Sequence, residues 1–597
     1  MSRSNTPKVS RSDWKLIQRF MRYVRPYWKW VLIGIISIPF SIGGTLLTPW
    51  LIQQIIDDYL LKNDLNGLSL MILILAGSVI LGYLADAFYT WSLQKAGQLA
   101  IFAMRRDLFK HLLLLPRSFY DKTPVGVALT RVTSDMESLG ESLAVGVLSI
   151  FTDAIKTIAL FSLLLYWSWQ LSLVIFLLLP PIYFTSRFLR AKLRNYYNLS
   201  REALAEGTGY LQECLRGIKT IQLYAAEPIV KQKFRHKTGE FLHAQSWSNF
   251  YEASLFSVVE GITSITMALI IWYGTREILD NALTVGVLVG FINTLNRIFV
   301  PIREFTQQIS VLQRSMASLE HIDVLFDELP DDHETSLSRE ILAKIRKFEE
   351  LKFENVKFRY TPEGPWVLKG ISFSIRKGQR IALVGSTGSG KSTIIRLITR
   401  MYKNYEGSIT LNGIELSQIS QSSLFEIISM MQQDNFLFDE TIAFNIGLGR
   451  PQITAEKIRN AAQYVFANSF IEQFPEKYDY RILENGKNLS SGQTQLLSFA
   501  RAIANDSELF ILDEATSSVD SVTEHLIEKA IDRVFEEKTV IAIAHRLSTI
   551  RHSDLILVMR DGLIQERGTH EELVDQQGIY ATLLNSLNEN SGEAVTL

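Results

Sequence analysis

Long apolar stretches occupy the first half of this 597-residue chain and constrain its fold more than any other feature. A bilayer has a hydrocarbon core about 30 Å thick, and a helix needs roughly 20 apolar residues to cross it. One such stretch is also compatible with a buried core helix, but six within one half of a chain favour membrane spans. The predicted spans are residues 31–52, 68–90, 143–167, 169–189, 252–273 and 284–306.

Charges in the connecting segments predict the orientation of these spans. The segment before the first span and the connections at 92–142 and 187–248 are rich in Lys and Arg, whereas the opposite connections are short and neutral or acidic. Because cytoplasmic loops carry the excess of Lys and Arg, both termini are expected in the cytoplasm. The N-terminal segment lacks the pattern of a cleaved signal peptide. Residues 13–29 combine aromatic and basic side chains in the pattern of an amphipathic helix on the membrane surface.

The two long cytoplasmic connections are expected to be helical. Apolar residues recur at near-helical spacing among the charges of 92–142, so the membrane helices are predicted to extend into the cytoplasm. Each excursion reverses direction, at 119–126 in the first and near 209–224 in the second. These reversals either contact a partner domain or form solvated hairpins.

Several ionisable residues fall inside the predicted spans. A charge at the bilayer centre costs at least ~2.5–3.5 kcal/mol, so such residues should face a bundle interior or water. Asp153 and Lys156 are three residues apart on one helix and could pair with each other. Glu260, Asn293 and Arg297 are candidates for a substrate path, and their mixed charge does not define the substrate.

Whole-chain composition excludes some partners and sites. Lys and Arg number 61 against 62 Asp and Glu, a net charge of −1, which gives no electrostatic reason to expect nucleic acid as a partner. Cys214 is the one cysteine, so an internal disulfide is excluded and a cysteine-based metal site is not expected.

The second half has the pattern of a nucleotide-binding domain. After a charged linker at 326–348, β-like runs at 352–360, 367–375 and 380–384 lead into a glycine-rich loop and a predicted helix at 392–401. Strand, loop and helix are the context that a phosphate-binding loop requires. Its glycines let backbone N–H groups approach phosphate, Lys391 reaches the β- and γ-phosphates, and Ser392 can ligate Mg²⁺. The loop residues are Gly385, Ser386, Thr387, Gly388, Ser389, Gly390, Lys391 and Ser392, followed by Thr393.

A second group of candidate residues follows the apolar strand predicted at 510–512. Asp513, at the end of this strand, is positioned to hold Mg²⁺ directly or through water. Glu514 comes next, and a carboxylate there can polarise the water that attacks the γ-phosphate. The alternative is a solvated acidic turn.

Between these two motifs lies the run Leu489-Ser490-Ser491-Gly492-Gln493, which resembles the signature of the ATP-binding-cassette (ABC) family. The stretch at 119–135 resembles the first intracellular loop of ABC exporters, and the resemblance covers essentially the whole chain. It implies a six-span helical membrane domain followed by an α/β phosphate-loop ATPase domain with a helical subdomain. It also implies a short coupling helix at each cytoplasmic reversal, docked into an ATPase domain.

The resemblance assigns further roles within the ATPase domain. Tyr360 would stack on adenine, and Gln433 would sense Mg²⁺ and the γ-phosphate. His545 would contact the γ-phosphate, and Asp520 would communicate between the two ATP sites. The signature residues Ser490, Ser491, Gly492 and Gln493 would complete the ATP site of a second, facing chain.

Taken together, these features predict one half of an exporter that uses ATP and Mg²⁺ to move amphipathic small molecules, including drugs, or lipids. The alternative is a regulatory or channel-type membrane protein gated by ATP. A bacterial inner membrane is expected, with the ATPase domain in the cytoplasm. Ser491 stands where the family usually has Gly, which favours a heterodimer over a homodimer. The expected domains are 1–29 (interfacial segment), 30–325 (membrane domain), 326–348 (linker), 349–586 (ATPase domain) and 587–597 (tail).

Overall fold

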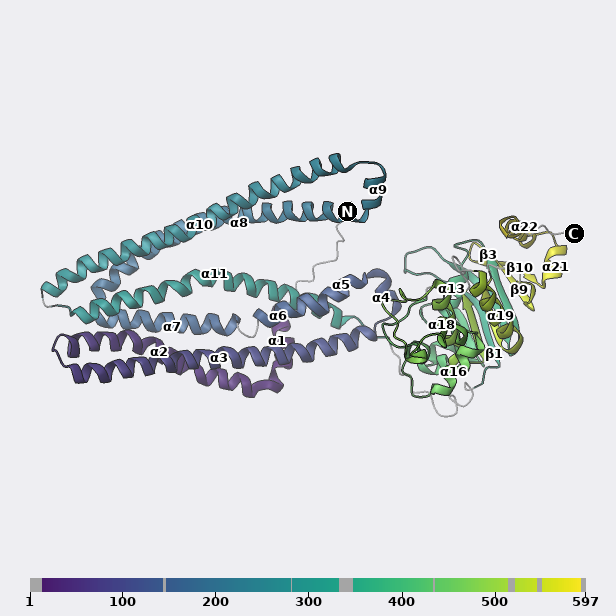
Figure 1. Cartoon of the computed structure of the whole chain (residues 1–597), viewed down its shortest axis with the longest axis horizontal. Helices are drawn as coiled ribbons and strands as arrows, with labels where there is room; N and C mark the ends of the chain where they lie inside the picture. Colours follow the sequence, from purple (N-terminus) through teal and green to yellow (C-terminus); the bar gives the residue numbers. More distant parts are fainter. Residues whose placement is uncertain are drawn as a thin grey trace. The chain divides into compact units, whose positions relative to one another are not determined.

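The computed structural model describes residues 13–142, 146–280, 282–331, 347–432, 435–513, 521–544 and 550–591. Two compact units are present, as drawn in Figure 1. The first unit runs to Lys110 and resumes from Ala128 to Asp327. The second unit combines His111–Val127 with the residues from Glu328 onward, so a short piece of the helical half belongs to the C-terminal half.

Long helices build the first unit, at the positions that the apolar stretches predict. Within the described residues, five helices are long and apolar enough to cross a membrane, and Val285–Leu295 is a shorter apolar helical stretch. The helices are α1 (Asp13–Val24), α2 (Trp28–Gln54), α3 (Leu65–Leu113), α6 (Met136–Ser142), α7 (Gly146–Trp167), α8 (Trp169–Arg216), α10 (Glu227–Leu279) and α11 (Val285–Asp327).

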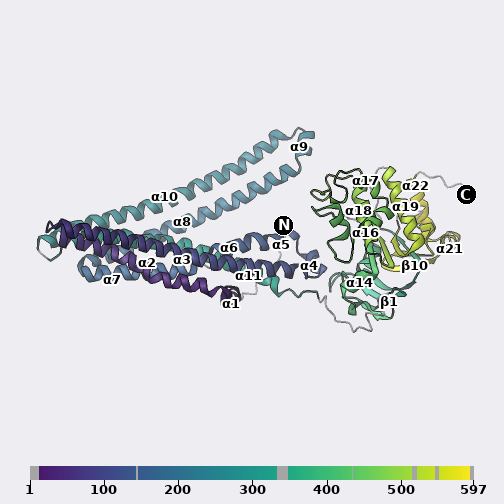
Figure 2. The same ribbon diagram turned by 60° about the horizontal axis from the view of Figure 1, so that its bottom comes forward.

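The three helices that enter the two long connections are far longer than a bilayer requires, as the sequence predicts. α3 has 49 residues, α8 has 48 and α10 has 53. At 1.5 Å per residue each spans about 70–80 Å, more than twice a hydrocarbon core. Short helices lie at the two reversals, α4 (Arg117–Lys122) and α9 (Ile218–Leu223). α8 and α10 run side by side and are joined through α9 (Figure 2).

Close contacts between small residues and one ion pair contribute to the packing of the first unit. A Cβ added to Gly44 of α2 would lie 2.7 Å from the Cα of Gly82 of α3, so the two helices approach as only small residues allow. The helix expected at 13–29 begins at Asp13 as α1 but ends at Val24, and Leu16 and Phe20 are buried within the unit, so its place on a membrane surface stays a prediction. Arg19 of the same helix pairs with Asp323 near the end of α11.

Two β-sheets form the second unit. One is antiparallel with the order β2-β1-β4-β5, and the other has the order β10-β9-β3-β8-β7-β6 and is parallel apart from β10. The first comprises β1 (Glu350–Phe358), β2 (Leu368–Arg376), β4 (Glu406–Leu411) and β5 (Ile414–Glu415). The second comprises β3 (Arg380–Gly385), β6 (Ile428–Met431), β7 (Leu509–Asp513), β8 (Thr539–Ile543), β9 (Leu555–Arg560) and β10 (Leu563–Gly568).

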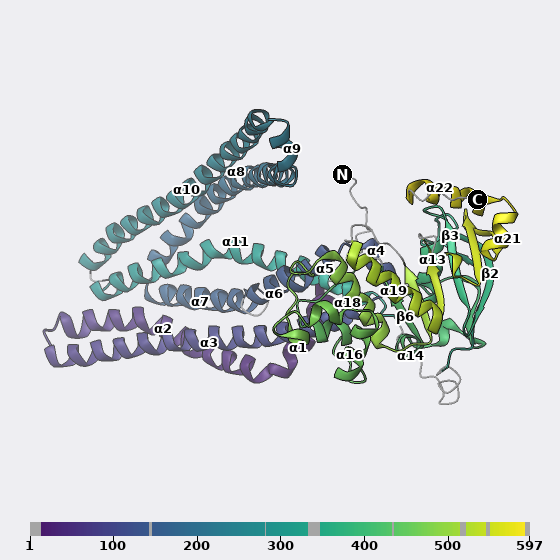
Figure 3. The same cartoon turned by 45° about the vertical axis from the view of Figure 1, so that its right-hand side comes forward.

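Alternating side chains of the parallel strands divide the core into layers. Ile381 and Leu383 pack with α13 (Lys391–Ile398) and the antiparallel sheet. Phe510 and Leu512 face the other way, against the helical subdomain that contains α16 (Ala455–Tyr464) and α18 (Ser491–Ala504), and against α19 (Ser521–Glu537). Figure 3 shows α13 and α19 beside these strands. Near-continuous apolar strands are what a parallel sheet buried on both faces requires.

The predicted strands and helix of this unit are present, with ends shifted by up to three residues; β1, for example, ends at Phe358 and not at 360. The helix predicted at 392–401 ends at Ile398. Arg400 has a φ of 57°, in the left-handed region, and its side chain donates to the carbonyl of Ser417 at 3.0 Å. That backbone conformation stops the helix, and the apolar pattern alone does not report it.

Candidate ATP-binding site

The carboxyl ends of neighbouring parallel strands gather the candidate residues at one edge of the sheet. β3 runs into the glycine-rich loop, and β7 ends at Asp513. β8 lies between them, pairing Ile543 with both Leu383 and Asp513. Ligands of open α/β sheets bind outside this edge. The topology therefore brings the loop and the predicted metal-binding acid to the same place.

Glycine is required at two positions of the loop. Gly385 has a φ of 153°, and an added Cβ would lie 2.2 Å from the carbonyl oxygen of Met559. Gly390 has a φ of 107° and forms the N-cap of α13, and its Cβ would meet Leu368 at 2.8 Å. The loop therefore wraps closely over the start of α13, where N–H groups and the helix dipole favour an anion.

Two side chains of the loop fit a bound triphosphate. The Ser389 hydroxyl is buried and has no hydrogen-bond partner within the described part of the chain. The Lys391 ammonium is also buried and donates to the carbonyls of Gly385 at 2.5 Å and Ser386 at 3.0 Å. Burial lowers the pKa of Lys391, and the charge of Asp513 acts in the opposite direction. Phosphate oxygens would be better acceptors for Lys391 than two neutral carbonyls, and they would supply the acceptor that Ser389 lacks.

Some predicted residues lie outside the described residues, although the strands before them are defined. They are Gln433, Glu514, Asp520 and His545. β6 ends at Met431, β7 at Asp513 and β8 at Ile543, so three of the four follow closely on strands that end at the same edge. Ser392 is exposed on α13, one residue after Lys391. With Asp513 it could hold Mg²⁺, leaving the other positions to water and phosphate.

Tyr360, predicted to stack on adenine, follows β1 and is 36% exposed. Its hydroxyl lies 2.8 Å from the Thr393 hydroxyl on α13. Phe358 and Tyr402 contact the ring edge-on, with centroids 5.0 and 5.2 Å away. The ring is therefore anchored next to the phosphate-binding loop with part of its surface open.

The signature run begins a helix. Ser490 is the N-cap of α18 and forms a capping box with Gln493, in which each side chain accepts from the other residue's backbone N–H. Ser490 and Ser491 are exposed, whereas Gly492 is buried. An exposed helix N-terminus suits contact with an anion held by another molecule.

Comparisons with known proteins identify the family. Residues 31–302 match the ABC transporter transmembrane region and residues 368–517 match the ABC transporter domain. The chain is 32% identical to YgaD of Bacillus subtilis, whose name proposes multidrug export, over 96% of this chain and 100% of that protein. It is also 32% identical to the ATP-dependent lipid A-core flippase of Chromohalobacter salexigens, over 96% of this chain and 98% of the flippase. The chain belongs to the ABC transporter family, exporter type.

A solved structure extends this likeness to the fold. A bacterial Atm1-family ABC exporter with ATP bound superposes with a TM-score of 0.72 at 23% identity, covering 95% of this chain and 99% of that one. The ABC exporter is thus an integral membrane protein with several spans and an ATP-binding domain. Family membership supports a dimer, and the comparisons give no support for preferring two different chains.

Residues 111–127 of this ABC exporter pack within the ATPase unit. Tyr402, after α13, donates a hydrogen bond from its hydroxyl to Asp121 of α4. The backbone N–H of Asp331 donates to the carbonyl of Leu114 at 2.7 Å, and Lys403 pairs with the Asp331 carboxylate. The first of the two reversals, at α4, is therefore held against the domain that contains the candidate ATP site.

The polar residues of the predicted spans are arranged differently from the sequence expectation. Lys156 of α7 donates to Asp86 of α3 at 2.9 Å, and Ser41 of α2 donates to the same carboxylate oxygen at 2.5 Å. The long Lys side chain reaches a neighbouring helix, so the expected pair with Asp153 is not the contact that the structure gives it. The three candidate residues of the substrate path differ in exposure. Glu260 is exposed, Arg297 is half-buried, and Asn293 has a buried side-chain oxygen without a partner in the described ranges.

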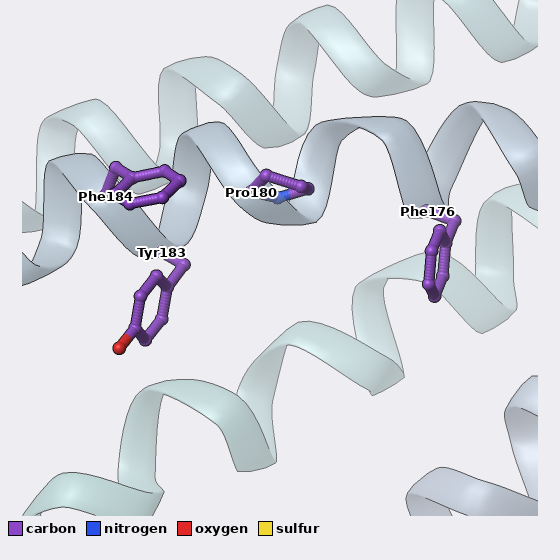
Figure 4. A pocket seen from close by; sticks show the side chains of 4 residues that line it. All are labelled: Phe176, Pro180, Tyr183 and Phe184. Carbon is purple, nitrogen blue, oxygen red and sulfur yellow. The ribbon is translucent and has the colours of Figure 1, made fainter.

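A hollow of about 370 Å³ lies on α8, lined by Phe176, Pro180, Tyr183 and Phe184 (Figure 4). Its lining is almost wholly apolar. Phe176 and Tyr183 are seven residues apart and project from one side of the helix. Inside a bilayer an apolar surface of this kind also contacts lipid tails, so its lining alone does not identify the hollow as a substrate site.

Sequence reasoning missed three residues around Tyr360. They are Asp121, Tyr402 and Arg396, and Arg396 donates to the Tyr360 hydroxyl at 3.0 Å. A signal for Arg396 existed, since it is a charged residue on the otherwise apolar run Ile394–Ile398. Asp121 and Tyr402 are 281 positions apart, and no local pattern connects them.

Proposed function

We propose that this chain is one half of an exporter that couples ATP hydrolysis to the movement of amphipathic small molecules or lipids across a bacterial membrane. The observation that carries the proposal is the position of residues 111–127. They continue from the membrane helix α3, yet they pack in the ATPase unit through Asp121 and Tyr402. A change at the ATP site can therefore act on a membrane helix through direct contacts.

Each candidate residue has a specific role in this proposal. The loop at 385–392 binds the phosphates, Lys391 offsets their charge, and Ser392 and Asp513 hold Mg²⁺ with Gln433. Tyr360 stacks on the adenine. Glu514 accepts a proton from the attacking water, and His545 donates to the γ-phosphate. Bound Mg²⁺ neutralises charge on the phosphates during the transfer.

The exposed start of α18 supports a composite site. Ser490 and the N–H groups at Ser491 and Gly492 would meet the γ-phosphate held by the loop of a second chain, with Gln493 supporting them, and Asp520 would link the two sites. Donors aimed at developing charge are a strong source of rate enhancement. We propose a dimer of half-transporters. The mass of the complex purified from its native membrane, with identification of its chains, decides between two identical chains and two different ones.

We also propose the orientation that the basic loops predict, with both termini and the ATPase domain in the cytoplasm of a bacterial cell. Cys214 provides the test, because it lies near the far end of α8. A membrane-impermeant maleimide should label Cys214 in inverted vesicles and not in intact cells. Labelling in intact cells would reverse the proposed orientation.

Replacement of Glu514 tests the catalytic assignment. Glu514→Gln should reduce ATP turnover by at least a hundredfold while ATP binding persists, because the variant keeps the loop and loses the base. Turnover at the wild-type rate would remove Glu514 from this role. In the alternative function, a channel gated by ATP, transport substrates would not stimulate ATP hydrolysis. The presence of the full set Lys391, Asp513, Glu514 and His545 favours the exporter.

A further inference from the structure

Arg396 is the one basic residue on the exposed face of α13. Lys391, Thr393, Ile394, Ile395, Leu397 and Ile398 are buried, so Ser392 and Arg396 are left as the exposed residues of this helix. These two are four residues apart and share a face. Ser392 has a predicted role in Mg²⁺ binding, whereas Arg396 has none in the reaction described above.

The contacts of Arg396 converge on Tyr360. Its guanidinium donates to the Tyr360 hydroxyl at 3.0 Å, and its central carbon lies 5.8 Å from the centre of the same ring. Asp121 and Tyr402 are close enough to act electrostatically on the guanidinium. The guanidinium therefore lies where the tyrosine and the segment 117–122 meet.

The hydroxyl of Tyr360 has a second anchor, Thr393, at 2.8 Å. Phe358 and Tyr402 lie at angles of 86° and 79° to the Tyr360 ring. These edge-on neighbours restrict the tilt of the ring, while the two polar contacts fix the position of its hydroxyl end. A ring held in this way does not lose rotational freedom when a flat base stacks on it, which strengthens binding.

We propose that Arg396 is a positioning residue for the nucleotide base. It holds the Tyr360 ring in the orientation that stacks on a purine, and it acts on the base through Tyr360 rather than by touching the nucleotide. This inference rests on the proposed function, in which Tyr360 stacks on adenine. Its consequence is selective: binding of the base depends on Arg396, whereas binding of the triphosphate does not.

The test compares two ligands on the full chain in lipid nanodiscs. Arg396→Gln should weaken ATP binding about fivefold to tenfold and raise the KM for ATP by a similar factor, with kcat unchanged. Inorganic tripolyphosphate, which lacks a base, should compete for the site equally well in the variant and the wild type. Arg396→Lys keeps one donor and should recover part of the ATP affinity. Arg380→Gln is the matched control, because Arg380 pairs with Asp554 elsewhere in the same unit.

A double-mutant cycle separates positioning from direct contact. Tyr360→Ala should weaken ATP binding, and adding Arg396→Gln to it should cause no further loss. Equal weakening of ATP and tripolyphosphate by Arg396→Gln, or an additive loss in the double variant, would overturn the inference. If Tyr360→Ala binds ATP normally, the stacking role of Tyr360 fails and the inference fails with it. If Tyr360→Ala loses affinity while Arg396→Gln does not, the inference fails and the proposed function stands.

Discussion

The contact between Tyr402 and Asp121 joins the ATP-binding domain to a segment that continues into a membrane helix, so its removal should uncouple the two. Tyr402 is 9% exposed, and its hydroxyl donates to the Asp121 carboxylate. Burial, followed by this hydrogen bond, raises the pKa of Tyr402, so the hydroxyl stays a donor throughout the physiological range. Tyr402→Phe removes the donor and keeps the ring.

The size of the effect expected for Tyr402→Phe follows from the charge and the exposure of the Asp121 carboxylate. A hydrogen bond to a charged group contributes about 1.5–3 kcal/mol. The Asp121 side chain is 37% exposed and also pairs with Arg117, with a nitrogen–oxygen distance of 3.2 Å, so the lower end applies. About 1.5 kcal/mol corresponds to roughly a tenfold change in an equilibrium. We expect Tyr402→Phe to reduce substrate stimulation of ATP hydrolysis about tenfold and to leave the basal rate near that of the wild type.

Tyr405→Phe is the matched control for this measurement. Tyr405 donates to Glu415 at 2.5 Å and is also partly buried, but its partner lies within the antiparallel sheet. This control should lose stability without losing substrate stimulation. Asp121→Asn should have the same effect as Tyr402→Phe, and the double variant should be no worse than either single one. Normal stimulation in both single variants, or additive losses in the double variant, would refute the reasoning.

Two further predictions test the signature helix and the polar contact between membrane helices. Ser490→Ala removes an N-cap and should cost about 1 kcal/mol of stability. Ser490→Ala should also lower ATP turnover at least tenfold. Thr569→Ala, which breaks a capping box at α21 (His570–Asp575), should cost similar stability with turnover retained. Equal turnover in the two variants would contradict the role of Ser490. Lys156→Met leaves Asp86 with one hydrogen-bond donor and should lower the free energy of unfolding, seen as a lower thermal unfolding temperature. The loss should be roughly 3 kcal/mol or less, since the Asp86 side chain is 41% exposed. Adding Asp86→Asn should recover part of this loss, and a larger loss in the double variant would show that the two residues do not stabilise each other.

Local patterns predicted much of this structure, and long-range contacts account for what they missed. The loop at 385–392 was predictable because its glycines and lysine act within one strand–loop–helix unit. The helix extensions followed from apolar spacing along single helices. The partner of Lys156 could not be predicted from a local pattern. Helical spacing suggests Asp153, three residues away, whereas the structure pairs Lys156 with Asp86, 70 residues away. The charge of Arg396 on an apolar run marks the residue, but its role does not follow from that run, since it depends on Tyr360, 36 residues earlier.

Export driven by ATP hydrolysis is the central claim about this chain, and accumulation in inverted membrane vesicles measures it most directly. A fluorescent amphipathic amine or a labelled phospholipid is followed in vesicles that contain the wild-type chain or Glu514→Gln. We expect accumulation that requires ATP and Mg²⁺ with the wild type, and none with the variant. Accumulation of the same size with Glu514→Gln, or movement that only follows the concentration gradient when ATP is present, would contradict it.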